Sequence, residues 1–117
     1  MNRGEIWWAE LPEPQKSEPG YRRPLVIIQS DAFNQSKINT VICAIITSNL
    51  RLENAPGNFI LKSKTSGLPK DSVVNVSQMI TIDKSFLVEK VGKLTPKLTH
   101  KLNDGLRLVL FFKLKND

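Results

Sequence analysis

The chain of 117 residues has few of the side chains on which common catalytic and structural sites depend, with one cysteine and one histidine. Cys43 cannot form an internal disulfide, and its place in the apolar run 41–46 predicts a buried, unreactive thiol. Because the chain has a single histidine, acid–base catalysis by a histidine pair is excluded. That residue, His100, lies among polar residues and is expected on the solvated surface. No Cys/His cluster has the spacing of a zinc site, and we expect neither a metal ion nor a cofactor.

Phosphate-binding glycine loops and the common hydrolase motifs are absent too, which excludes nucleotide-dependent and metalloprotease functions. No stretch approaches the ~18 consecutive apolar residues of a membrane span, so we expect no membrane association. No apolar signal segment follows the first five residues, and this predicts a cytoplasmic protein. The length predicts one domain over residues 1–117.

Positive charge is in excess, with a net charge of +6, but no Lys/Arg block is longer than two residues. Such an excess favours nucleic acid or an acidic protein as a partner, without indicating the fold. Because the charges are dispersed, folding must bring them together.

Short apolar and β-branched runs separated by turn signals predict a mainly β protein with an α component, folded as a small, partly closed antiparallel barrel. The predicted strands are 4–11, 25–29, 40–46, 58–61, 72–76 and 79–82. Strands 25–29 and 40–46 are apolar on both faces, which predicts central positions. In the first strand, Ile6, Trp8 and Leu11 are expected on one face and Trp7 on the other.

The C-terminal segment has helical periodicity. Thr95 is the predicted N-cap, followed by Pro96 at the first helical position. The apolar positions are Leu98, Leu102, Leu106, Val109 and Leu110, which predicts an amphipathic helix packed on the barrel. Gly105 should weaken this helix by about 1 kcal/mol relative to alanine. A short helical turn is expected at 83–87, and the polar segment 12–23 is a long loop of the kind that often carries function.

Four segments occur in an order that resembles the MazF/PemK family of toxin endoribonucleases. They are Arg3-Gly4-Glu5-Ile6-Trp7-Trp8, the stretch from Ser17 to Ile28, Ala44-Ile45-Ile46-Thr47-Ser48, and Asp71-Ser72-Val73-Val74 leading into Gln78-Met79-Ile80-Thr81-Ile82-Asp83-Lys84. Each is weak alone, but the ordered set spans nearly the whole chain.

The resemblance implies an SH3-like barrel of the CcdB/MazF/PemK type with short helices, paired as a homodimer. It implies sequence-specific, metal-independent cleavage of single-stranded RNA that leaves a 2′,3′-cyclic phosphate and a 5′-hydroxyl. Such an mRNA interferase is the toxin of a type II toxin–antitoxin system. A separate antitoxin would cover the RNA groove with an acidic, partly disordered C-terminal segment.

The resemblance also assigns site residues. By position it matches Arg23 and Thr47, which with Glu18 are the expected catalytic residues, and Ser17 and Gln78, which are expected to bind RNA. Tyr21 and Arg22 are further expected RNA-binding residues because, in the loop, they could stack on or contact bases, and Ser48 beside Thr47 is another. Ile80 departs from the family, whose members often carry a basic residue there. This difference affects the expected target sequence more than the activity.

The chemistry of these side chains agrees with the assignment. Arginine presents a planar, permanently charged fork that matches phosphate bidentately. Pro24 biases the backbone of Arg23 toward extended geometry, which suits a strand entry. Thr47 can add a hydroxyl hydrogen bond to the same phosphate. A permanently charged guanidinium makes a poor base, so Glu18 and a water molecule are candidates for base and acid, and these roles stay open.

Two other functions fit the same barrel. One is a CcdB-like toxin that binds and poisons a topoisomerase without nuclease activity. The other is a non-catalytic RNA-binding domain. Arg23-Pro24 after a Ser-Glu loop, and Thr47 at a strand end, favour the nuclease.

Overall fold

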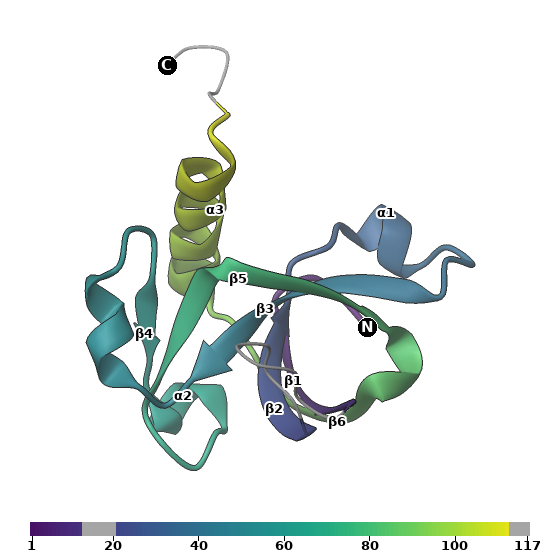
Figure 1. The fold of residues 1–117 in the computed structure, drawn as a ribbon, viewed down its shortest axis with the longest axis horizontal. Helices are drawn as coiled ribbons and strands as arrows, with labels where there is room; N and C mark the ends of the chain where they lie inside the picture. The colour runs from purple at the N-terminus through teal and green to yellow at the C-terminus, as the bar shows by residue number, and fades with distance from the viewer. Residues whose placement is uncertain (13–20, 113–117) are drawn as a thin grey trace.

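The computed structural model describes residues 1–12 and 21–112, which form six strands and several helices (Figure 1). The strands are β1 (Glu5–Leu11), β2 (Tyr21–Ile27), β3 (Thr40–Thr47), β4 (Phe59–Leu61), β5 (Ser72–Asp83) and β6 (Leu87–Lys93). The α-helices are α1 (Asp31–Asn34), α2 (Ser63–Ser66) and α3 (Pro96–Leu110), and the 3₁₀ helices are η1 (Leu50–Asn54) and η2 (Lys84–Phe86). No helix in the described segments is long and apolar enough to cross a membrane.

The strands form one antiparallel sheet in the order β4-β5-β3-β2-β1-β6. β2 and β3 occupy its centre, as their apolar sequences predict. The sheet curls through β2, β1 and β6 back toward the far end of β5 (Figure 1). Within the described residues β4 and β6 do not pair with each other, so the curl stays open. The predicted mainly β fold, a partly closed barrel with a C-terminal helix, is confirmed.

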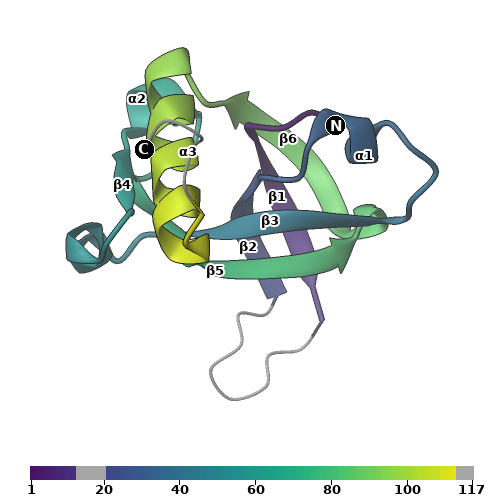
Figure 2. The same cartoon turned by 90° about the horizontal axis from the view of Figure 1, so that it is seen from above.

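Each face of the sheet packs its own apolar cluster. The first cluster joins the sheet to α3 and includes Ile6, Val26, Ile46 and Leu102, and α3 lies beside β5 in both views (Figures 1 and 2). The second cluster lies on the opposite face and includes Leu25, Ile27, Ile45 and Leu87. The central strands β2 and β3 are apolar on both faces because each face packs into one of the two clusters.

The two tryptophans confirm the alternation predicted for β1. Trp8 packs against the first cluster with Ile6, and Trp7 packs against the second. The prediction for Leu11 is wrong, because Leu11 joins the second cluster. Side chains alternate along a strand, so the odd-numbered residues of β1 share the face of Trp7.

Helix α3 begins as predicted. The Thr95 hydroxyl accepts a hydrogen bond from Leu98 N at 3.2 Å, and Pro96 follows in the first turn. The side chains that pack on the sheet cluster are Leu98, Leu102, Leu106 and Val109. Leu110 is 53% exposed, so its predicted place on the packed face is wrong. It follows Val109 directly, which turns it about 100° away from that face.

Three other differences concern the sheet. The segment 79–82 is not a separate strand, because β5 runs from residue 72 to 83 with a register shift against β3. Strand β6 is absent from the sequence predictions, and four of its seven residues are exposed. β2 begins at Tyr21, which pairs with Leu11, so the predicted loop 12–23 ends earlier than expected. The helical turn predicted at 83–87 is confirmed by η2.

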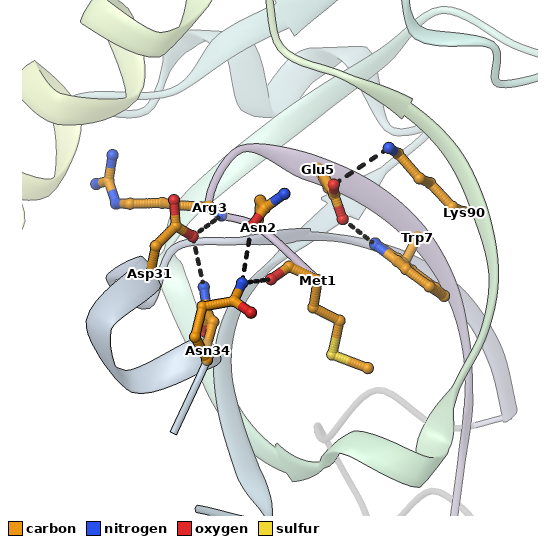
Figure 3. Close-up of polar contacts among 9 residues, drawn as sticks. Met1, Asn2, Arg3, Glu5, Trp7, Asp31, Asn34 and Lys90 are labelled. Atoms are coloured by element: carbon orange, nitrogen blue, oxygen red, sulfur yellow. Dashed lines mark hydrogen bonds and ion pairs between the residues drawn. The ribbon is translucent and has the colours of Figure 1, made fainter. Parts of the chain in front are cut away.

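Polar contacts tie the start of the chain to the rest of the fold (Figure 3). The buried Glu5 carboxylate accepts a hydrogen bond from Trp7 Nε1 at 3.0 Å and pairs with Lys90 Nζ at 3.1 Å. Burial alone would raise the pKa of Glu5, but hydrogen bonds from Trp7, the Asn2 backbone and Lys90 outweigh it and lower that pKa. Because these contacts link β1 to β6, the ionised carboxylate stabilises the edge of the sheet.

Candidate active site

The register of the central strands brings Arg23 and Thr47 together. Leu25 pairs with Ile45, Val26 with Ala44 and Ile27 with Cys43. Continuing this antiparallel register by two residues places Arg23 opposite Thr47. Residues opposite each other on antiparallel strands have side chains on the same face about 5 Å apart at Cβ. The sequence prediction that these two residues share a site therefore has a geometric basis.

A cleft of about 260 Å³ lies at this end of the sheet. Its lining residues come from β1, β2, the end of β3 and the residue after it, β5, and the connection between α2 and β5: Trp8, Arg22, Arg23, Pro24, Ile46, Thr47, Ser48, Leu68, Pro69, Lys70 and Ser72. The polar members are cations and hydroxyls, and no carboxylate is among them. This composition suits an anion with several oxygen atoms.

Arg23 and Thr47 both have hydrogen-bonding capacity left for a ligand. Arg23 is partly buried, and its Nε has no hydrogen-bond partner among residues 1–12 and 21–112. A buried unpaired donor is costly, so it is more often found where a ligand supplies the acceptor. The Thr47 Oγ1 accepts a hydrogen bond from Asn49 N at 3.1 Å. Its hydroxyl proton is thereby directed to another acceptor, such as a phosphate oxygen.

Arg22 also borders the cleft, but carboxylates on two other strands offset its charge. Its Nη2 lies 2.9 Å from Glu89 Oε1, and its Nη1 lies 3.8 Å from Glu10 Oε1. The guanidinium carbon lies 4.8 Å from the ring centroid of Trp8. Arg22 therefore bridges β1, β2 and β6 and covers the indole, which holds this wall of the cleft in place.

The structure does not bring all the predicted site residues to the cleft. Ser48 lines it, whereas Tyr21 lies at the start of β2, 62% exposed and with a φ of 58°. Gln78 lies at the register shift of β5, where its Oε1 accepts a hydrogen bond from Asn75 Nδ2 at 3.2 Å. Ser17 and Glu18 lie outside the described residues.

Seven cleft residues are missing from the sequence-based site, and three of them have side chains that can donate a hydrogen bond: Trp8, Lys70 and Ser72. Ser72 lies in one of the four family segments, so the sequence does carry a signal that could have selected it as a site residue. Trp8 packs against the core, as expected for an aromatic strand residue, and also lines the cleft. Lys70 belongs to the connection between α2 and β5, and nothing in the local sequence distinguishes it from other lysines.

The remaining reactive groups lie elsewhere. Cys43 is buried, and burial raises the pKa of its thiol to about 12, which agrees with the predicted inert thiol. His100 is exposed on α3, as expected. Ile80 is partly buried against the second apolar cluster. No group of three His, Cys, Asp or Glu residues that could hold a metal ion occurs in segments 1–12 and 21–112.

A small curved sheet with cations and hydroxyls at one end fits a protein that binds a phosphate chain, and comparison with known proteins identifies its family. The family model described as PemK-like, MazF-like toxin of type II toxin–antitoxin system matches residues 2–110. The chain is 47% identical to endoribonuclease MazF6 of Mycobacterium tuberculosis over 110 residues, which are 94% of this chain and 96% of that protein. It is 36% identical to endoribonuclease MazF of Staphylococcus saprophyticus, covering 94% of this chain and 91% of that protein.

Solved structures share the fold. An endoribonuclease in complex with its cognate antitoxin, from a mycobacterial species, superposes with a TM-score of 0.78 at 21% identity, covering 97% of this chain and 98% of that one. MazF of Deinococcus radiodurans gives a TM-score of 0.76 at 18% identity, covering 96% and 97%. The chain belongs to the MazF/PemK toxin family, and the family prediction is confirmed.

Proposed function

We propose that this endoribonuclease toxin cuts single-stranded RNA at a short sequence motif without a metal ion, leaving a 2′,3′-cyclic phosphate and a 5′-hydroxyl. The observation that carries the proposal is that Arg23 and Thr47, which lie just beyond the paired residues of β2 and β3, both line one cleft. Both side chains can bind the same phosphate.

In the proposed reaction the ribose 2′-oxygen attacks the phosphorus and the bond from phosphorus to the 5′-oxygen breaks. Arg23 stabilises the charge on the phosphoryl oxygens with its planar fork. Thr47 donates its hydroxyl proton to one of them, since Asn49 N already occupies an acceptor site of that hydroxyl. Removing one such preorganised donor typically costs about 10²–10³ in rate.

Two protons must move. The 2′-hydroxyl proton passes to a base, and the leaving 5′-oxygen takes up a proton. We assign the base to Glu18 and the proton donor to a water molecule, because a permanently charged guanidinium suits Arg23 to charge stabilisation rather than to proton abstraction. Ser17, Tyr21, Arg22, Ser48 and Gln78 are the proposed RNA contacts around this centre.

The proposed assembly is a homodimer of one domain over residues 1–117, acting in the cytoplasm with an antitoxin as partner. The end of α3 exposes a group of large apolar side chains, which supports self-association: Leu108 (59% exposed), Leu110 (53%), Phe111 (84%) and Phe112 (53%). Structural neighbours that contain an antitoxin include a mycobacterial endoribonuclease and MazE–MazF of Deinococcus radiodurans. An acidic antitoxin segment lying over the cleft would meet the same cations as RNA.

The test is cleavage of a long single-stranded RNA by the purified protein in excess EDTA. We expect cleavage by the native protein, none by Arg23→Ala and a strong reduction in Thr47→Ala. Arg51→Ala is the matched control, because it removes an exposed arginine of η1 that does not line the cleft. Circular dichroism checks that all variants are folded.

Several results would contradict the proposal. Full activity in folded Arg23→Ala would refute the site, and cleavage that appears only with magnesium would refute the mechanism. RNA with 2′-O-methyl groups must resist cleavage if the 2′-oxygen is the nucleophile. Inhibition of a topoisomerase without RNA cleavage would indicate the CcdB-like function instead.

A further inference from the structure

We infer, on the basis of the proposed function, that Lys70 binds a phosphate of the RNA next to the one held by Arg23. Lys70 lies on the connection between α2 and β5, far in sequence from both catalytic residues. Folding nevertheless places it in the lining of the cleft that Arg23 and Thr47 share. A chain of phosphates passing Arg23 can therefore meet a second cation in the lining of the same cleft.

The charges around the cleft distinguish Lys70 from Arg22. Three cations line it, but Arg22 is paired with Glu89 at 2.9 Å and lies 3.8 Å from Glu10. Among the residues that the structure describes, no carboxylate oxygen lies within 4.0 Å of Lys70 Nζ. The positive charge that the cleft offers to RNA thus comes mainly from Arg23 and Lys70, and Arg22 contributes a smaller share.

The backbone that carries Lys70 is held on both sides. Leu68 is 4% exposed and anchors the connection in the first apolar cluster. Ser72 Oγ donates a hydrogen bond to the Lys70 carbonyl oxygen at 3.0 Å. Asp71 is not among the residues that line the cleft, and its carboxylate accepts a hydrogen bond from Ser63 N at 2.8 Å. The lysine stem therefore starts from a fixed point, which lowers the entropy lost when the ammonium group binds phosphate.

The test measures binding separately from cleavage, with a 2′-O-methyl single-stranded RNA that cannot form the cyclic phosphate. Lys70→Gln should raise the Kd roughly three- to tenfold at low salt. It should also reduce the slope of log Kd against log salt by about 0.7, the value for one phosphate contact in a single strand. Lys70→Arg should keep both the Kd and the slope. In steady-state cleavage of ordinary RNA, KM should rise for Lys70→Gln while kcat stays within about threefold.

Lys64→Gln is the matched control. Lys64 is an exposed lysine of α2 that lies outside the cleft lining, so its removal changes the net charge equally. An effect of Lys64→Gln equal to that of Lys70→Gln would overturn the proposal, because the effect would then come from overall charge. A native Kd and salt slope in Lys70→Gln would overturn it as well, and so would a loss of kcat with KM unchanged.

The outcome is independent of the cleavage chemistry. If the native protein fails to cut RNA in EDTA, the proposed function is wrong, but the binding measurements on the 2′-O-methyl strand still decide the role of Lys70. If Arg23→Ala abolishes cleavage and Lys70→Gln binds normally, the proposed function stands and the inference about Lys70 is wrong.

Discussion

Replacing Gly105 with alanine should destabilise the protein, although alanine is the better helix former. In an isolated helix this change would stabilise by about 1 kcal/mol. In the fold, a Cβ at position 105 would lie 2.5 Å from the Gly57 carbonyl oxygen and 3.1 Å from Val76 Cγ1. An ordinary carbon–oxygen contact is about 3.3 Å or longer, so α3 or the turn at Gly57 must shift by nearly 1 Å.

The turn has little freedom to move away. Gly57 has a φ of +82°, and a Cβ added there would itself meet the Gly105 backbone at 3.0 Å. Overpacking of this kind costs about 1–3 kcal/mol, and the upper end applies because the obstacle is backbone rather than a side chain. After the gain in helix propensity, the net loss should be about 2 kcal/mol. For a chain of this size that lowers Tm by roughly 8 °C.

Thermal and urea unfolding followed by circular dichroism would measure this difference. His100→Ala is the control, because His100 is exposed on the same helix and alanine should stabilise it by a few tenths of a kcal/mol. If Gly105→Ala proves as stable as the native protein while His100→Ala behaves as expected, the tight approach of α3 to the turn at Gly57 does not limit this position.

Three further predictions concern stability and reactivity. The Cys43 thiol, with a pKa of about 12, should resist a thiol reagent at pH 8 and react once urea unfolds the protein; rapid labelling of the folded protein would contradict its burial. Thr95→Ala should cost about 1 kcal/mol of unfolding free energy, because Leu98 N loses its cap acceptor, while Thr95→Ser should retain most of that stability. The pKa of Glu5 in the folded protein lies below its ordinary value. The ionised carboxylate therefore contributes fully to the free energy of unfolding at pH values above the ordinary pKa, and this contribution is lost as pH falls through the lowered pKa. The urea midpoint should therefore decline in acid more steeply for the native protein than for Glu5→Gln, and equal pH profiles would show that Glu5 is not responsible.

Local sequence patterns predict the elements that are stabilised by contacts within the element or by a strongly apolar sequence. The cap at Thr95, the helix after it and the two central strands follow from such patterns. β6 does not, because its residues Leu87–Lys93 are largely exposed and it is a strand only through its pairing with β1. The extension of β5 through residues 77 and 78 is equally invisible, since the register shift there interrupts the alternation of buried and exposed side chains.

The candidate site, too, is predicted from the sequence only in part. Arg23 and Thr47 can be selected from the family segments and from the chemistry of phosphate binding. Their opposition depends on the register between β2 and β3, which short apolar strands do not specify in sequence. Lys70 reaches the cleft only because Leu68 and Ser72 fix the connection before β5. In the sequence Gly105 only weakens the helix, whereas in the fold the carbonyl of Gly57 leaves no room for a Cβ at this position.

The open curl of the sheet has a consequence for self-association. Within the described segments β4 and β6 each pair on one side only, which leaves two edges where a strand of a second molecule could add. β4 has only three residues, and β6 exposes the charged side chains of Glu89, Lys90 and Lys93. Short length and charge are features that oppose edge-to-edge strand pairing and the growth of fibres. The proposed homodimer is therefore expected to form by contact between side chains rather than by continuing the sheet from one subunit into the next, so that two copies associate and no third is recruited along an edge.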